Sequence, residues 1–367
     1  MTNWATPALS SRLVQIRAIK ALVSAQTVRS MISHWRTGLA LLTALLLSAC
    51  SSGNSLAQHQ PKADWSLADM PAQDGRIYLV TGGTSGIGYE SAKALAAAGA
   101  HVIIAARNPQ RGQEAIERIR QETPDAQLQF EALDLADLAS VKALATRLDS
   151  TLPHLDGLIN NAGLMEPAER GTSTDGLEIQ FAVNYLGHFA LTEELLPLLQ
   201  KADNPRVVTL SSIAARARGA AINFADLQFE QDYDASLAYR QSKLACLMFA
   251  LELQRRSDVA GWGITSIASH PGVSYTNLLP SQGRSLPPLP FLFQTAAQGA
   301  IPTLYAATAP DAIGGRYYGP TGLMEVRGPL GLARVPANAL DAQAVARLWS
   351  VSEALSRTHY PSSPLAD

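Results

Sequence analysis

Short, continuous apolar runs recur along the chain from residue 77 onward, with longer amphipathic stretches between them. The first run, Ile77-Tyr78-Leu79-Val80, ends in a glycine-rich turn, as a parallel strand buried on both faces does. Similar runs occupy residues 101–105, 127–132, 157–160, 207–210 and 264–268. Each of these runs is short enough to be a strand, so the pattern predicts a sheet whose strands are covered on both sides.

Helical spacing of small or apolar residues fills the intervals between these runs. Residues 86–98 have this spacing, and Gly99 follows as a helix stop. Residues 113–123 predict a charged surface helix, and residues 178–200 and 237–256 predict longer ones. Strands that alternate with helices in this way predict an α/β fold, with a parallel sheet between two layers of helices.

The first 63 residues contain no acidic side chain, and five basic residues within the first 36 precede an uncharged stretch at residues 37–49. Thirteen residues are too few to span a bilayer as a helix, which takes about 20. The layout is typical of a secretory signal, and Leu47-Ser48-Ala49-Cys50 resembles a bacterial lipobox, in which the cysteine is lipidated. The sequence therefore predicts a leader at residues 1–50, a tether at 51–74, one catalytic domain at 75–360 and a tail at 361–367.

Two interpretations of this leader stay open. Either Cys50 tethers the protein to a membrane of the cell envelope, or the leader is an anchor or a disordered extension on a cytoplasmic enzyme. No twin-arginine signal for the export of a folded, cofactor-loaded protein is visible.

The composition argues against several classes of function. The net charge is −2 and there is no basic patch with interleaved aromatic residues, which argues against nucleic acid as a partner. The two cysteines, Cys50 and Cys246, are far apart and predict neither a disulfide framework nor a metal site.

A glycine-rich turn at residues 81–88 joins the first predicted strand to the first predicted helix. In that context the glycines allow a diphosphate to approach the backbone closely, and the helix N-terminus stabilises its charge. The candidate cofactor residues of this turn are Thr81, Gly82, Thr84, Ser85, Gly86, Ile87 and Gly88.

The end of the second predicted strand favours one form of the cofactor. A dinucleotide fold that prefers NAD places an acid there, against the ribose 2′-hydroxyl, but this chain reads Ala105-Ala106-Arg107-Asn108. Arg107 can pair with a 2′-phosphate instead, so we expect NADP(H) rather than NAD(H).

Tyr239 and Lys243 lie four residues apart in a predicted helix and therefore share a face. A free tyrosine has a pKa of about 10, and a fixed positive charge nearby would lower it. A tyrosine tuned in this way can exchange a proton with a carbonyl or alcohol oxygen.

Taken in order, these motifs resemble the short-chain dehydrogenases/reductases. They are Thr81-Gly82-x-x-x-Gly86-Ile87-Gly88, Asn160-Asn161-Ala162-Gly163, Ser212, Tyr239-x-x-x-Lys243 and Pro271-Gly272, and the match covers about residues 76–357. The long interval from Ser212 to Tyr239 and the segment Gly315-Arg316-Tyr317-Tyr318-Gly319-Pro320 resemble the branch of retinol dehydrogenases, protochlorophyllide reductases and WW-domain oxidoreductases. The resemblance implies a Rossmann-type doubly wound sheet of about seven strands in a single domain.

The resemblance also implies site roles. Tyr239 is the expected general acid/base, Lys243 lowers its pKa and holds the nicotinamide ribose, and Ser212, rather than Ser211, binds the substrate oxygen. Asn184 is expected to hold a water in the proton relay, although Tyr185 follows it where many relatives carry histidine. The further residues expected at the cofactor are Asp134, Asn161, Ala162, Gly163, Pro271, Gly272 and Thr276; no metal is expected, and His188 and His270 are interpreted as packing residues.

The leading hypothesis is therefore an NADP(H)-dependent oxidoreductase that interconverts a carbonyl and an alcohol on an apolar small molecule. The apolar segment 278–293 lies where the family covers its substrate, although it would equally suit a membrane contact or packing. The rival is a catalytically silent, dinucleotide-binding sensor or scaffold of the cell envelope. A homodimer through the helices that hold Asn184 and Tyr239 is a further expectation from the family.

Overall fold

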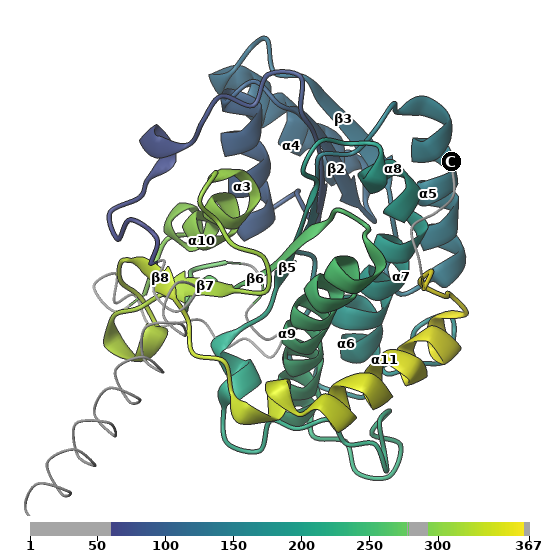
Figure 1. The fold of residues 1–367 in the computed structure, drawn as a ribbon. Helices are drawn as coiled ribbons and strands as arrows, with labels where there is room; N and C mark the ends of the chain where they lie inside the picture. The colour runs from purple at the N-terminus through teal and green to yellow at the C-terminus, as the bar shows by residue number, and fades with distance from the viewer. Residues whose placement is uncertain (1–59, 277, 279–292, 363–367) are drawn as a thin grey trace, which may run out of the picture. The chain divides into compact units, whose positions relative to one another are not determined.

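The computed structural model describes residues 60–276, 278 and 293–362, and in these residues the strands form one eight-stranded sheet (Figure 1). The order is β3-β2-β1-β4-β5-β6-β7-β8, parallel except for β8, which pairs antiparallel with β7. The strands are β1 (Ile77–Thr81), β2 (His101–Ala106), β3 (Leu128–Ala132), β4 (Gly157–Asn160), β5 (Arg206–Leu210), β6 (Thr265–Ser269), β7 (Tyr317–Pro320) and β8 (Leu330–Leu332). The predicted doubly wound parallel sheet is confirmed.

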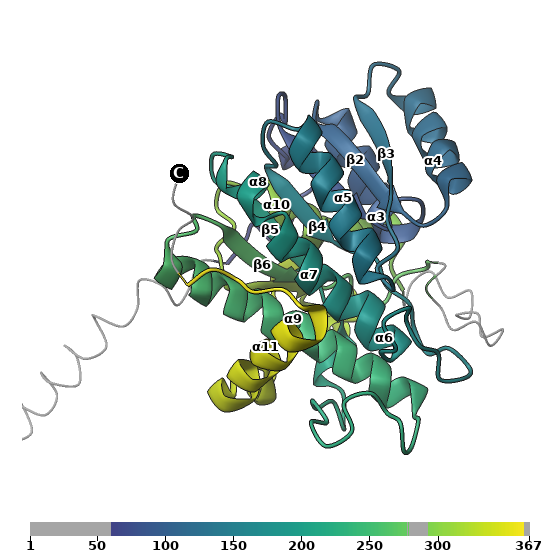
Figure 2. The same cartoon turned by 90° about the vertical axis from the view of Figure 1, so that its right-hand side faces the viewer.

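Helices cover both faces of this sheet. One layer holds α3 (Gly86–Ala97), α4 (Pro109–Glu122) and α10 (Ala296–Thr308), and the other holds α5 (Leu138–Thr151), α7 (Gly187–Glu194) and α9 (Ala235–Ala260) (Figures 1 and 2). Side chains of β1 alternate between two apolar cores, because Leu79 packs on the α9 side and Val80 on the α3 side. This double burial explains the continuous hydrophobic run from Ile77 to Val80.

The predicted helix at residues 178–200 is divided into four parts. They are α6 (Ile179–Phe181), a π-helical segment (Ala182–Leu186), α7 and α8 (Leu196–Gln200). Pro197 at the start of α8 lacks the N–H that would continue the preceding helix. Single-turn π segments often mark functional sites, and this one contains Asn184.

The predicted tether is described from residue 60 and packs on the domain before residue 75. Trp65, which is followed by a 3₁₀ turn (Leu67–Asp69), is buried and makes an edge-on contact with Tyr305, with the ring centroids 5.5 Å apart. Gln73 accepts a hydrogen bond of 2.6 Å from the hydroxyl of Tyr78 in β1. The predictions for the leader, for Cys50 and for residues 363–367 concern residues outside the described ones. Among the described helices, none combines the length and apolar content needed to cross a bilayer.

The last helix, α11 (Ala342–Ser356), lies across α7 and α9 (Figure 2). Its Trp349 contacts Phe189, Phe249 and Tyr360, with ring centroids 5.0, 6.0 and 4.7 Å away. The guanidinium of Arg256 lies 4.1 Å above the Trp349 ring. The C-terminal segment therefore completes the apolar core beneath the sheet.

We expect Trp349→Ala to lower the free energy of unfolding by about 3–5 kcal/mol, because truncation of a buried aromatic leaves a cavity. Urea denaturation followed by circular dichroism measures this loss. Leu340→Ala is the control, since Leu340 is 64% exposed and its truncation should change stability by about 0.5 kcal/mol or less. Equal losses in the two variants would contradict the packing role of Trp349.

Candidate active site

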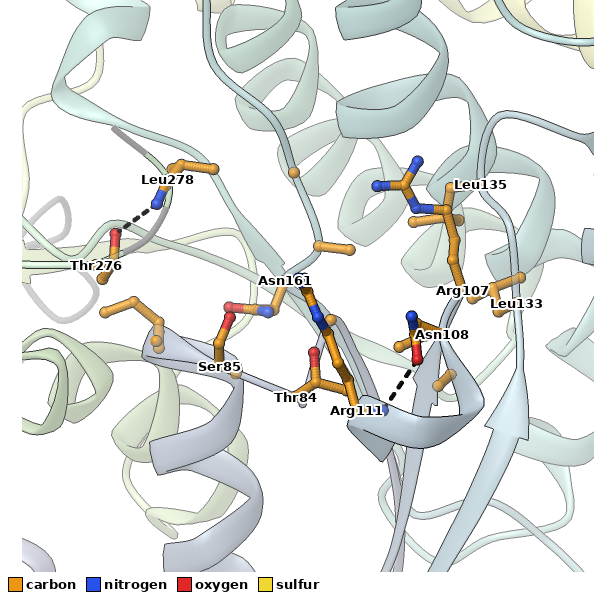
Figure 3. Close-up of a pocket in the computed structure, with 18 of the residues that line it drawn as sticks. Thr84, Ser85, Arg107, Asn108, Arg111, Leu133, Leu135, Asn161, Thr276 and Leu278 are labelled. Atoms are coloured by element: carbon orange, nitrogen blue, oxygen red, sulfur yellow. Dashed lines mark hydrogen bonds between the residues drawn. The ribbon is translucent and has the colours of Figure 1, made fainter. Parts of the chain in front are cut away.

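The strand order reverses between β1 and β4, which places a crevice at the carboxyl ends of the strands. A cavity of about 890 Å³ lies there, next to the turn between β1 and α3 (Figure 3). The predicted cofactor residues that line it are Gly82, Thr84, Ser85, Gly86, Ile87, Gly88, Arg107, Asp134, Asn161, Ala162, Gly163 and Thr276. Most of the predicted cofactor residues thus come together in one site.

The glycine turn is shaped by close approach of backbone to backbone. Gly82 has φ +69°, and a Cβ there would lie 2.9 Å from the Cα of Ala162. A Cβ at Gly88 would lie 2.4 Å from Nδ2 of Asn161. Ser85 makes no side-chain cap to α3, so the first N–H groups of this helix are not bonded by their N-cap residue and can bind an anion.

Thr81 does not line the cavity, because it is fully buried behind the turn. Its hydroxyl oxygen accepts hydrogen bonds from the backbone N–H groups of Asn161 and Ala162, at 2.9 and 3.0 Å. Asn161 Nδ2 in turn donates to the Thr81 carbonyl at 2.7 Å. Thr81 therefore holds the glycine turn and the Asn161 loop together, and the cavity offers it no cofactor contact.

Pro271 and Gly272 also lie outside the cavity wall. The Pro271 carbonyl accepts a hydrogen bond of 2.6 Å from Nε2 of Gln294, and Gly272 has φ +64°. Backbone hydrogen bonds join Gln294 to Val273 and Tyr275, each at 2.9 Å. These contacts join the chain before the predicted substrate segment, residues 278–293, to the chain that follows it. Residues 279–292 of this segment lie outside the described residues.

Two arginines face one end of the cavity. Arg107 follows β2, and Arg111 lies in the first turn of α4, where Asn108 caps the helix by accepting a hydrogen bond of 3.0 Å from the Arg111 N–H (Figure 3). Within the described ranges neither guanidinium has a hydrogen-bond or ion-pair partner. Arg118 is different, since it donates to the Thr84 carbonyl at 3.1 Å and stacks on Tyr89. Arg111 escaped the sequence analysis, although its spacing from the Asn108 cap could have indicated it.

The four expected catalytic residues converge beside the other end of the cavity, outside its immediate wall. A Cβ at Gly163, which lines the cavity, would lie 3.1 Å from Oδ1 of Asn184 and 3.5 Å from Nζ of Lys243. Lys243 is 4% exposed and donates to the Leu210 carbonyl at 3.2 Å. Tyr239, one helical turn earlier in α9, lies near the Ser212 side chain, which lowers the pKa of its phenol.

The two adjacent serines have different environments. Ser211 is buried and donates a hydrogen bond of 2.7 Å to the backbone carbonyl of Lys243. Ser212 is half-buried and its hydroxyl accepts a hydrogen bond from the Ala214 N–H while also bonding Tyr239. This geometry supports Ser212 rather than Ser211 as the substrate-facing serine.

The electrostatics of Tyr239 differ from the expectation. Burial raises the pKa of its phenol to about 12, and the hydrogen bond with Ser212 offsets only part of that rise. Cys246 and Glu166 raise this pKa further, and Lys243 is not among the described groups that act on it. The net pKa of the phenol is therefore raised by burial, while the ammonium of Lys243 donates to the Leu210 carbonyl and has its own pKa lowered by burial, so a lowering of the phenol pKa by Lys243 stays a prediction.

Asn184 is held by its neighbours on every side. Its amide donates to the Leu164 carbonyl and to Ser242 Oγ, at 3.0 and 2.9 Å, and its Oδ1 accepts from the Leu164 N–H at 2.8 Å. The side chain is thus used for positioning, and a role in holding water stays a prediction. Tyr185 points elsewhere, bonding Ser352 of α11 at 2.7 Å, so the departure at this position leaves Asn184 undisturbed.

His188 is buried, as expected for a packing residue, but it also joins two parts of the site. Its Nδ1 lies 2.9 Å from the Asn184 carbonyl, which can only accept, so Nδ1 carries the proton. Its Nε2, 2.9 Å from the Thr81 hydroxyl, is then the acceptor. Sequence reasoning could not find this link, because it joins residues 107 positions apart.

Two further residues escaped the sequence analysis. Ser242 lies inside the Tyr-x-x-x-Lys pattern, where nothing distinguishes it from a spacer. Glu166 has a left-handed backbone, with φ 47°, and its N–H donates to the buried side chain of Gln180 at 2.9 Å. Strained residues of this kind cluster at functional sites.

Comparison with known proteins agrees with this geometry. The family model described as short chain dehydrogenase matches residues 76–286. A polyprenol dehydrogenase of Danio rerio is 40% identical, over 68% of this chain and 80% of its own length. Retinol dehydrogenase 14 of Mus musculus is 38% identical, over 78% of this chain and 87% of its own length.

Solved structures give the same result. The crystal structure of an uncharacterised protein from Mycobacterium paratuberculosis is 38% identical, with a TM-score of 0.68 over 81% of this chain and 99% of that one. A short chain dehydrogenase structure from Escherichia coli CFT073, complexed with NADPH, is 27% identical, with a TM-score of 0.53 over 70% of this chain and 98% of that one.

Burial lowers the pKa of His188 to about 4, well below its usual value, so the folded protein takes up this proton less readily than the unfolded chain. Stability attributable to His188 should be complete above about pH 6.5 and decline by up to about 3 kcal/mol as the pH falls toward 4. We expect His188→Gln to flatten this part of the pH–stability curve, measured by urea denaturation at a series of pH values. His359→Gln, at an exposed position, should leave the slope unchanged; a slope that His188→Gln does not alter would refute the assignment.

Proposed function

The chain belongs to the short-chain dehydrogenase/reductase family, in its retinol dehydrogenase-like branch, and is a nicotinamide-dependent oxidoreductase; on that premise we propose that it uses NADP(H) to interconvert a carbonyl and an alcohol on an apolar small molecule, with Tyr239 as the general acid/base. The observation that carries this proposal is the convergence of Ser212, Tyr239, Lys243 and Asn184 beside the cavity, with the Ser212 side chain near enough to the Tyr239 phenol to lower its pKa.

Tyr239 and Ser212 have different roles in the proposed proton transfer. A nicotinamide, when bound, donates or accepts the hydride. With a pKa of about 12 the Tyr239 phenol is protonated at neutral pH and can give its proton to a carbonyl oxygen. Ser212 lies within hydrogen-bond reach of that phenol and can orient the same oxygen. Lys243 and Asn184, which meet at Gly163, hold the adjoining edge of the cavity.

The cofactor preference rests on Arg107 and Arg111. Both guanidiniums are exposed at the cavity end opposite the catalytic residues, where the ribose of the adenosine half would bind. A 2′-phosphate gives each arginine a charge-assisted partner. The Escherichia coli relative complexed with NADPH is consistent with this preference.

The apolar substrate is supported by the relatives and by the segment after Thr276. Relatives named for polyprenol and retinol act on long apolar alcohols. Tyr275 and Phe293 pack edge to face at 5.7 Å and bring the two ends of the apolar segment together. No observation favours the silent sensor, since a protein that only binds has no use for the Tyr239 and Ser212 pair.

Quaternary structure and location remain proposals. In the described structure α11 and Tyr360 cover the α7 and α9 surfaces that the expected homodimer would use, so a second copy would have to pack on α11. A membrane tether through Cys50 rests on the sequence of the leader alone.

Tyr239→Phe should reduce kcat about 10²- to 10⁴-fold, which is the usual contribution of a general acid/base, while NADPH binding stays intact. The assay is NADPH oxidation against a panel of aldehydes, ketones and quinones, with the Kd for NADPH from fluorescence. Tyr360→Phe removes an equally buried hydroxyl far from the cavity and is the control. Wild-type rates in Tyr239→Phe would remove the catalytic assignment, and binding without turnover in the wild type would favour the sensor.

Arg107→Ala should weaken NADPH binding about ten- to hundredfold and NADH binding very little, because a hydrogen bond to a charged group contributes about 1.5–3 kcal/mol. Titrations of both nucleotides measure the ratio. Arg120→Ala, in the following helix α4 but away from the cavity, is the matched control. A parallel loss for both nucleotides would show that Arg107 does not read the 2′-phosphate.

A further inference from the structure

Three consecutive residues in the turn after β7, none of them glycine, have left-handed backbones. The φ angles are 42° at Leu323, 55° at Met324 and 65° at Glu325. Each such residue costs free energy, so a run of three needs support from its surroundings. Burial does not supply that support, because Leu323 is 56% exposed and Met324 is 80% exposed.

Polar contacts to Glu325 supply it instead. Its Oε1 accepts a hydrogen bond of 3.2 Å from the Arg334 N–H. Its Oε2 lies 3.1 Å from the Arg216 guanidinium and 3.3 Å from Nε2 of His270. Within the described residues neither of these two approaches is aligned as a hydrogen bond, so the attraction is electrostatic. Arg216 also donates to the Met324 carbonyl at 2.8 Å.

Arg216 connects this turn to the serine of the active site. It is the last residue of the 3₁₀ turn Ile213–Arg216, whose N-cap is Ser212. Tyr317 of β7 also contacts Ser212, because its hydroxyl donates to the Ser212 carbonyl at 3.2 Å. Its ring packs against His270, with the ring centroids 5.0 Å apart. The position of Ser212 therefore depends on Arg216, which pairs with Glu325, and on Tyr317, which packs on His270, a second neighbour of Glu325.

The turn after β7 also contacts Gly272 and Val273, which precede the predicted substrate segment. The Val326 carbonyl accepts a hydrogen bond of 2.8 Å from the Val273 N–H, and a Cβ at Gly272 would lie 2.3 Å from that carbonyl. On the ring of His270, Nδ1 accepts from the Gly272 N–H at 3.2 Å, which leaves the proton on Nε2, facing Glu325. Glu325 thus lies between the serine turn and the segment that begins at Pro271.

We propose that Glu325 is a positioning residue: through Arg216 and His270 it fixes the serine turn 212–216 against the segment 271–273, and so sets the place of the Ser212 hydroxyl relative to Tyr239. The inference rests on the proposed function, and it assigns to Glu325 no contact with substrate or cofactor.

Glu325→Gln tests the proposal, because it keeps the shape of the side chain and removes the charge that attracts Arg216. We expect kcat to fall about tenfold or more, as small misplacements of reacting groups do, while the Kd for NADPH changes less than about twofold. Hydrogen–deuterium exchange of peptides covering residues 212–217 should become faster. This second measurement does not depend on turnover.

Glu252→Gln is the matched control. Glu252 is equally sheltered, with its side chain 6% exposed against 14% for Glu325, and it also pairs with two arginines, Arg255 and Arg256. It lies on α9 beyond Lys243, away from the cavity. This variant should lose stability without losing kcat or changing exchange at residues 212–217.

The possible outcomes each support or contradict the positioning role of Glu325. Equal kcat in the two variants, with unchanged exchange at 212–217, would overturn the proposal. If Glu325→Gln does not fold, Arg216→Lys, which keeps the charge without the planar fork, should give the same fall in kcat and the same faster exchange, and their absence would count equally against it. If the wild type shows no Tyr239-dependent turnover, the proposed function fails, and the exchange measurement alone then decides the role of Glu325.

Discussion

A single buried hydroxyl organises the site. Thr81 Oγ1 accepts the backbone N–H groups of Asn161 and Ala162 and meets Nε2 of His188, whose other nitrogen donates to the Asn184 carbonyl. The glycine turn after β1, the loop that follows β4 and the π-helical segment are thereby joined at one point, at the carboxyl ends of β1 and β4. A side chain without a hydroxyl at this position would leave two buried N–H groups and a ring nitrogen without partners, which is costly in an apolar interior.

Burial, rather than the nearby ammonium, dominates the chemistry of the Tyr239 phenol. The pKa of the phenol is raised, and that of the Lys243 ammonium is lowered, for the same reason: each charged form is less favourable away from water. The four-residue spacing places both groups on one side of α9, but the Leu210 carbonyl holds the ammonium. Proximity along a helix therefore does not by itself determine which charge a titratable group feels.

The sequence was sufficient for the features that depend on local pattern. The continuous apolar runs located six strands, and the order of motifs located most of the cavity wall and the neighbouring hydroxyls of Ser212 and Tyr239. Features that depend on distant pairs were missed. The three-residue strand β8 has too short a pattern to detect, and Thr81 was assigned to the cofactor because nothing in a glycine motif shows which face of the turn a side chain occupies. Glu325 and Tyr317 are linked to Ser212 only by folding, across about a hundred residues of chain.

The aromatic contacts of α11 have a consequence for biosynthesis. Trp349 and Tyr360 are synthesised about a hundred residues or more after Phe189 and Phe249, which they cover. During synthesis that apolar surface stays uncovered until α11 has emerged. A nascent chain stalled near residue 340 would therefore expose it and be prone to aggregation.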